Sequence, residues 1–185
     1  MAICVCVAVG AFLAFRVFGT GSAVTPPPRS AAAGLSRAPV GEGAERSGRV
    51  VRVRDGDSLV VRIGGIGTEV RLDGVDCPEL AQAYGRSAKR FTADLAFGHE
   101  VRLLAKGLDK YNRELAEVLL PDGRSLNREL VSAGYAWWFR RHSSDRDLEE
   151  RERQARAARR GLWADPNPVP PWDFREAHPA AERRR

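Results

Sequence analysis

Three acidic residues stand next to turns between strand-like segments, where their carboxylates could meet. Asp57 follows the turn Asp55-Gly56, and Asp76 and Glu79 flank Cys77-Pro78. Proline kinks a strand and keeps neighbouring side chains out of a regular ladder. If the two segments pair, three carboxylates come together, and their mutual repulsion favours a bound cation. Oxygen ligands of this kind suit a hard cation such as calcium better than zinc.

These acids also admit other interpretations. Asp55 could serve as well as Asp57, and so could Asp73, although strand alternation places Asp73 on the same face as Arg71. Both Asp-Gly-Asp and Asp-Cys-Pro-Glu are ordinary turn compositions. The spacing alone therefore leaves a metal site and a pair of plain turns both open.

Two arginines lie near the acids in the sequence. Arg71 stands five residues before Asp76, and Arg113 follows the segment 109–112. A guanidinium is permanently charged and matches phosphate oxygens with a bidentate fork. Beside a divalent cation, two such groups could stabilise the extra charge of a five-coordinate phosphorane. For each arginine alone, a solvated side chain is the alternative.

The elements that must position these residues follow from the apolar pattern. Five β-branched runs punctuated by turn residues predict strands at 50–53, 59–63, 68–72, 101–104 and 115–120. Apolar residues at helical spacing predict helices at 87–98 and 126–134 and a third after Ser144. This order is typical of an α+β fold that is mainly β, a five-stranded OB-like Greek-key barrel with three helices.

The flanking segments differ in composition from this body. Residues 2–15 are almost wholly apolar, so we interpret 1–23 as a signal peptide or membrane anchor, although no Lys or Arg precedes the run. Residues 24–47 predict a disordered linker, 48–163 the folded domain, and 164–185 an extended or disordered Pro- and Arg-rich tail. We therefore expect an extracytoplasmic protein, secreted or tethered to a membrane only through its N-terminal segment.

Charge and cysteine usage narrow the class of protein. The 185 residues carry a formal net charge of +6, which suits a polyanionic partner. Of three cysteines only Cys77 lies in the body, which excludes a disulfide framework and a cysteine zinc site there. Trp137 and Trp138 could stack on bases, but we favour packing of at least one in the core.

Five stretches of the body occur in a recognisable order: VRVRDGDSLVV at 51–61, VRLDGVDCPEL at 70–80, AYGRSAK at 83–89, DKYNRELAEV at 109–118 and LNRELVSAGYAWW at 126–138. Through these stretches, residues 48–163 resemble the staphylococcal nuclease (thermonuclease) family. The resemblance implies a calcium-dependent phosphodiesterase on an OB barrel, and we expect a monomer. It also implies cleavage of the 5′ P–O bond of DNA or RNA, which leaves 3′-phosphates.

The resemblance assigns a metal site and a general base. Asp57 and Asp76 match the family's calcium carboxylates, and Cys77 matches the position whose backbone carbonyl binds calcium. Glu79 matches the residue that acts as general base or organises the attacking water.

The resemblance also assigns the residues that bind substrate. Arg71 and Arg113 match the two phosphate-binding arginines. Lys110 and Tyr111 match residues that contact a terminal phosphate of a bound nucleotide.

Two other functions stay open at this point. The barrel could be a non-catalytic nucleic-acid-binding module of the cell envelope, although the five charged site positions favour an enzyme. Alternatively, the Pro- and Arg-rich tail could be the functional part of an envelope protein.

Overall fold

The computed structural model describes residues 41 and 43–179. The predicted signal peptide or anchor at 1–23, and the predicted linker up to residue 40, lie outside these residues. Among the helices in the described part of the chain, none is both long and apolar enough to cross a bilayer.

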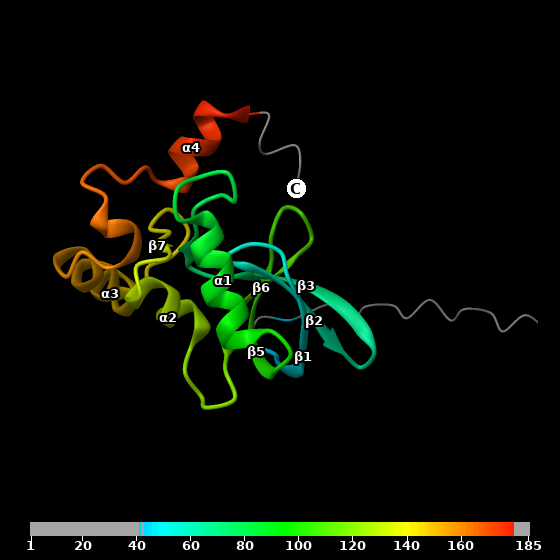
Figure 1. The fold of residues 1–185 in the computed structure, drawn as a ribbon. Helices are drawn as coiled ribbons and strands as arrows, with labels where there is room; N and C mark the ends of the chain where they lie inside the picture. The colour runs from blue at the N-terminus through cyan, green and yellow to red at the C-terminus, as the bar shows by residue number, and fades with distance from the viewer. Residues whose placement is uncertain (1–40, 42, 180–185) are drawn as a thin grey trace, which may run out of the picture. The chain divides into compact units, whose positions relative to one another are not determined.

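Five strands close into a barrel, in the order β1-β2-β3-β6-β5 (Figure 1). They are β1 (Glu45–Val53), β2 (Ser58–Ile63), β3 (Ile66–Leu72), β5 (Glu100–Leu108) and β6 (Glu114–Leu119). Neighbouring strands are antiparallel except β3 and β6, which run parallel. The predicted five-stranded OB-like α+β fold is confirmed, and β1 begins three residues before the predicted start of the domain.

Alternation along the strands builds the core of the barrel. Successive strand side chains point to opposite faces, so Leu59 and Val61 of β2 are fully buried while Arg62 is exposed. Val70 and Leu103 contribute from β3 and β5 and are equally buried. The same period therefore decides which polar residues of these strands reach the surface.

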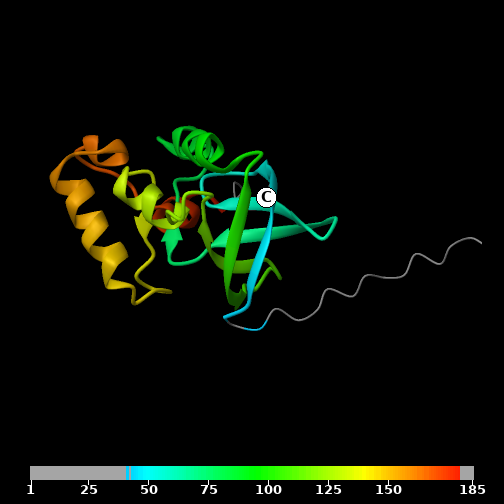
Figure 2. The same ribbon diagram turned by 90° about the horizontal axis from the view of Figure 1, so that it is seen from below.

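Helices follow the strands at three predicted places and one unpredicted place. They are α1 (Gly85–Ala96), α2 (Leu126–Ser132), α3 (Arg146–Ala157) and α4 (Pro171–Ala177), with a short 3₁₀ turn at Gly161–Ala164. Figure 2 shows α1 against the barrel and α3 beside α2. The three predicted helices are confirmed.

The prediction that the tail is extended or disordered is wrong for α4. Proline at the first helical position needs no hydrogen bond from its nitrogen and has a suitable φ, so Pro171 starts the helix instead of preventing it. The Trp172 ring stacks on Phe139, with ring centroids 5.6 Å apart, and packs edge-on against Trp137. Tertiary packing therefore holds this short helix in place.

A second, two-stranded sheet joins the barrel to the helical region. Strand β4 (Val75–Asp76) pairs antiparallel with β7 (Trp137–Trp138), so Asp76 lies opposite Trp137. Sequence reasoning did not predict this pairing, because two-residue strands carry no readable alternation. Trp137 is buried, which confirms that at least one of the two tryptophans packs in the core.

Candidate active site

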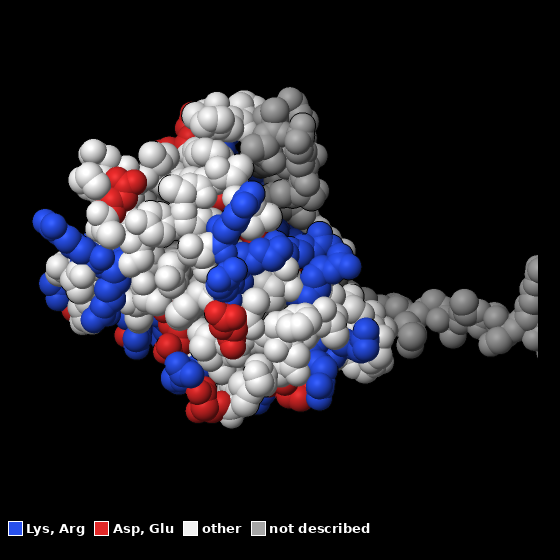
Figure 3. Space-filling view, in the orientation of Figure 1, with Lys and Arg blue, Asp and Glu red and all other residues white. Residues whose placement is uncertain are grey.

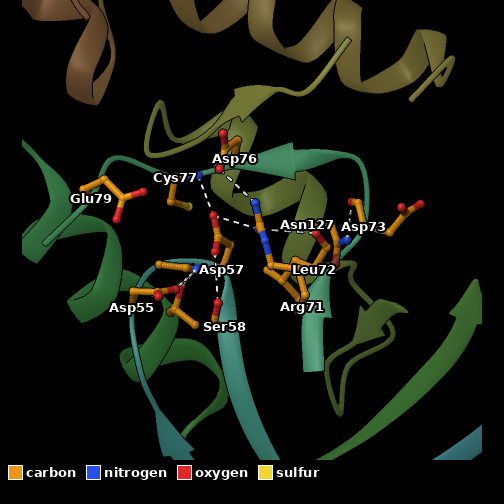
Figure 4. Close-up of polar contacts among 12 residues, drawn as sticks. Asp55, Asp57, Ser58, Arg71, Leu72, Asp73, Asp76, Cys77, Glu79 and Asn127 are labelled. Atoms are coloured by element: carbon orange, nitrogen blue, oxygen red, sulfur yellow. Dashed lines mark hydrogen bonds and ion pairs between the residues drawn. The ribbon is translucent and has the colours of Figure 1, made fainter. Parts of the chain in front are cut away.

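Arg71 joins the two acidic segments. Ser58 at the start of β2 lies opposite Arg71 in the register of β3, so Asp57, just before β2, lies beside the arginine. Arg71 Nη1 is 2.8 Å from Asp57 Oδ2, and Nη2 donates to Asp76 Oδ1 at 2.8 Å (Figure 4). The expected convergence of Asp57 and Asp76 is therefore present.

The group is almost completely shielded from solvent. Asp57 is 3% exposed, Asp76 1% and Arg71 9%. The Cys77 backbone N–H donates to Asp57 Oδ2 at 2.6 Å, which fixes the carboxylate. Burial alone would lower the pKa of Arg71, but the charges of Asp57 and Asp76 outweigh it and raise that pKa above its ordinary value. Arg71 is therefore a permanent cation held between two carboxylates.

The Cys77 side chain is buried and packs in the core. Burial, followed by the charge of Asp57, raises the pKa of the thiol well above its ordinary value, so the sulfur stays protonated. A Cβ added to Gly56 would lie 2.7 Å from the Cys77 sulfur, which shows how closely the two segments approach.

Arg113 approaches the group from the turn between β5 and β6. Asp109 positions it: Arg113 Nε donates to Asp109 Oδ2 at 2.7 Å, and its backbone N–H donates to Oδ1 at 2.8 Å. Arg113 Nη1 lies 3.4 Å from Ser58 Oγ, which in turn lies 3.3 Å from Asp57 Oδ1. Both predicted phosphate-binding arginines therefore face the edge where β2 begins.

Lys110 and Tyr111 lie on the same turn and are exposed. Lys110 Nζ is 4.9 Å from the centre of the Tyr111 ring, and Arg113 Cζ is 5.5 Å from it. The ring thus contacts two cations, an arrangement worth about 0.5–1 kcal/mol per contact at an exposed site. Both residues therefore lie on the exposed part of the turn that carries Arg113.

Arg175 is a site residue that sequence reasoning missed. Its Nη2 donates to Asp76 Oδ2 at 2.7 Å, and its Nη1 donates to Glu79 Oε1 at 2.9 Å. Burial would lower the pKa of Arg175, but the hydrogen bond and charge of Asp76 raise it above the ordinary value. The proline that begins α4 was the available signal, since an N-terminal proline followed by Trp and Asp is compatible with a helix start.

The two alternative acids have different positions. Asp55 is buried, and its Oδ1 accepts a hydrogen bond from the Asp57 backbone N–H at 3.1 Å, so it supports Asp57. The expectation that Asp73 shares the face of Arg71 is wrong. Strand β3 ends at Leu72, so its alternation does not extend to Asp73, which lines a separate hollow with Lys106 and Glu117 (Figure 4).

Comparison with known proteins identifies the family of this chain. The staphylococcal nuclease homologue family matches residues 69–165. A protein of Escherichia coli O157:H7 named an uncharacterized endonuclease is 39% identical over 132 residues, which cover 71% of this chain and 86% of that protein. A Shigella flexneri protein named micrococcal nuclease is 38% identical over 144 residues, covering 72% and 83%. A probable staphylococcal-like nuclease of rice is 33% identical over 106 residues, covering 57% and 28%. The chain belongs to the staphylococcal nuclease family.

Membership of this family implies a calcium site. No group of three or more His, Cys, Asp or Glu residues within 41 and 43–179 is arranged to hold a metal ion. The buried carboxylates of Asp57, Asp76 and Glu79 nevertheless lie together, joined by ion pairs to Arg71 and Arg175, with buried Asp55 beside Asp57. The donors of this group are carboxylate oxygens. In donor type, these residues of the staphylococcal nuclease domain fit a hard dication.

Basic residues also flank the site on the surface. Arg86 and Arg90 of α1 are exposed, and so are Arg140 and Arg141 after β7. Figure 3 shows Lys and Arg side chains gathered beside α1 and over the adjoining part of the barrel. Such a distribution attracts a polyanion in a salt-dependent way.

Proposed function

We propose that this protein is a calcium-dependent nuclease that hydrolyses phosphodiester bonds of DNA or RNA and leaves 3′-phosphates. The observation that carries the proposal is the buried group in which Arg71 bridges Asp57 and Asp76, with Arg113 on the same edge. The nuclease names of the relatives support the same activity.

Asp57, Asp76 and the Cys77 carbonyl are the residues that would hold calcium. When bound there, calcium supplies Lewis-acid polarisation of a phosphate oxygen. Hydrogen bonds from the Cys77 backbone N–H and from Arg71 already fix the positions of Asp57 and Asp76.

The arginines and Glu79 have separate tasks. Arg113 is held by Asp109 and so presents its guanidinium to a phosphate at the barrel edge, where it stabilises the charge of the transition state. Arg71 does the same from the buried side. Glu79 orients the attacking water and accepts its proton. Lys110 and Tyr111 bind a terminal phosphate at the exposed end of the edge.

A digest of labelled single- and double-stranded DNA and RNA tests the proposal. Cleavage should occur with calcium and stop with EGTA, and products should become substrates for a template-independent polymerase only after phosphatase treatment. Arg113→Gln should reduce the rate by about 10²–10³. Arg124→Gln is the matched control, because Arg124 is an exposed arginine paired with Asp122 and Glu129.

Two outcomes would refute the proposal. Equal cleavage in calcium and EGTA would remove the metal dependence, and an Arg113→Gln rate equal to that of the control would remove the phosphate-binding role. Salt-dependent binding without cleavage would indicate the nucleic-acid-binding module instead.

We also propose an extracytoplasmic location, which the apolar composition of residues 2–15 supports. Fractionation of cells into cytoplasm, membrane and medium tests it, and activity confined to the cytoplasm would refute it.

A further inference from the structure

The guanidinium of Arg175 sits on the carboxylates that the proposed nuclease reaction needs. It contacts Asp76, the proposed metal ligand, through both oxygens, at 2.7 Å and 3.3 Å, and it contacts Glu79, the proposed base, at 2.9 Å. Asp76 and Glu79 precede it by 99 and 96 residues, so this contact joins α4 to β4 and the segment that follows β4. Arg175 is itself only partly exposed, at 20% of its side chain.

Contacts outside the ion pairs hold α4 in this position. Trp172 lies one helical turn before Arg175, on the same face, and its ring stacks on Phe139 at an interplanar angle of 11°. The Gln82 side chain donates to the Val169 carbonyl at 2.5 Å, just before α4. The docking of α4 therefore rests on packing and hydrogen bonds as well as on charge.

Gln82 also connects α4 to the segment that contains Glu79, the proposed general base. Its Oε1 accepts a hydrogen bond from the Glu79 backbone N–H at 3.2 Å, while its Nε2 holds Val169. Movement of α4 and rearrangement around Glu79 are thus connected through one side chain.

Arg71 contacts one oxygen of Asp76, whereas Arg175 contacts both, so a dication that binds Asp76 meets Arg175 on each oxygen and the two cations repel each other strongly. At the contact distances of this site the two cations would lie within a few ångströms of each other, in partly buried surroundings where screening is weak. Each therefore lowers the affinity of the carboxylates for the other.

Resting on the proposed nuclease function, we propose that α4 is a tethered competitor of the metal ion. Arg175 occupies Asp76 and Glu79 while the dication is absent, and binding of the dication displaces Arg175 and loosens α4. The measured affinity for the dication is then reduced by the fraction of molecules in which the helix is docked. By reciprocity, the dication weakens the docking of α4 to the same extent.

Calcium titration of the full chain by calorimetry, in a mild detergent because residues 2–15 are apolar, tests the proposal without any activity measurement. Arg175→Gln should bind calcium about tenfold more tightly than the parent, which corresponds to a helix docked about 90% of the time in the parent. Arg153→Gln is the matched control, because it removes the same charge from an exposed pair with Glu150 on α3. It should bind as the parent does.

A second variant separates docking from charge. Trp172→Ala removes the aromatic anchor of α4 without changing any charge, and it should also raise the affinity for calcium. In the parent, calcium should speed hydrogen exchange at the backbone N–H of Phe174 in α4, which donates to the carbonyl of Pro170 just before the helix.

The possible results are distinguishable. If the parent and Arg175→Gln bind calcium equally, or if Trp172→Ala leaves the affinity unchanged, the competition is refuted while the proposed nuclease stands. If none of the proteins binds calcium, both this inference and the metal dependence of the proposed function fall.

Discussion

Arg71 should be essential for the stability of the barrel, independently of any activity. Its side chain is 11% exposed and pairs with Asp57 and Asp76, whose side chains are 4% and 2% exposed. Replacement by methionine, Arg71→Met, keeps much of the volume but leaves two buried carboxylates without this cation. Breaking a buried ion pair in this way costs about 3–5 kcal/mol, because the remaining charge stays in the interior.

The loss of free energy of unfolding should be far smaller when an exposed ion pair on the same barrel is broken. Arg102 on β5 lies 2.9 Å from Glu45, and both side chains are 51% exposed. A surface pair of this kind contributes at most about 1 kcal/mol, so Arg102→Met is the matched control. The free energy of unfolding of each variant is obtained from urea titrations in the presence of EDTA.

The free energies of unfolding of Arg71→Met and Arg102→Met could also contradict this reasoning. If Arg71→Met loses no more free energy of unfolding than Arg102→Met, Arg71 does not neutralise the buried carboxylates, and the electrostatic argument for the site is wrong. A large loss for both variants would instead show that the solvent does not screen the exposed pair.

Three further substitutions test the scaffold around the site. A Cβ at Gly85 would lie 1.8 Å from the Glu79 carbonyl oxygen, so Gly85→Ala should displace Glu79 and lower the cleavage rate. It should also lower the free energy of unfolding, measured in urea, by about 1–3 kcal/mol. A parent-like cleavage rate would contradict the positioning of Glu79. Asn127→Leu removes a buried amide that bonds the backbone of three residues, and it should lower the thermal midpoint, because each backbone group left unpaired costs about 1–3 kcal/mol. Burial would raise the pKa of Asp109, but hydrogen bonds from Arg113 lower that pKa below the ordinary 3.8. Ionised Asp109 therefore stabilises the folded protein above pH 3.8, and this stabilisation is lost as the pH falls through the lowered pKa. Urea titrations should therefore show Asp109→Asn less stable than the parent at pH 7 and nearly equal to it at the lowest pH; a difference that does not depend on pH would exclude the charge of Asp109 as its cause.

The barrel could be predicted because its strands carry their signal locally. Alternation of buried Leu59 and Val61 with exposed Arg62 fixes a face of β2 without knowledge of any partner strand. The same applies to the convergence of Asp57 and Asp76, which required only that two segments next to turns lie side by side. Glycine and proline at those turns indicated where each segment ends.

Features that depend on distant contacts could not be predicted in the same way. The pairing of β4 with β7 joins Val75 to Trp138 through two residues on each side, too few for a period. Asp73 was placed on the wrong face because one turn residue ends the alternation that the prediction extended. In both cases tertiary structure decides where local preference is weak.

Arg175 is a residue of the candidate site itself that could not be predicted from the sequence. The chain contains thirty lysines and arginines, so residue type alone does not distinguish this arginine from its neighbours in the tail. What distinguishes it is the aromatic packing of Trp172 on Phe139, which holds α4 beside Asp76 and brings the guanidinium to two acids almost a hundred residues earlier. The family match ends at residue 165, before α4 begins, so resemblance gave no indication of it either. A tail that a family comparison leaves out can therefore still contribute a charged group to the site, and its contacts must be determined from the three-dimensional structure.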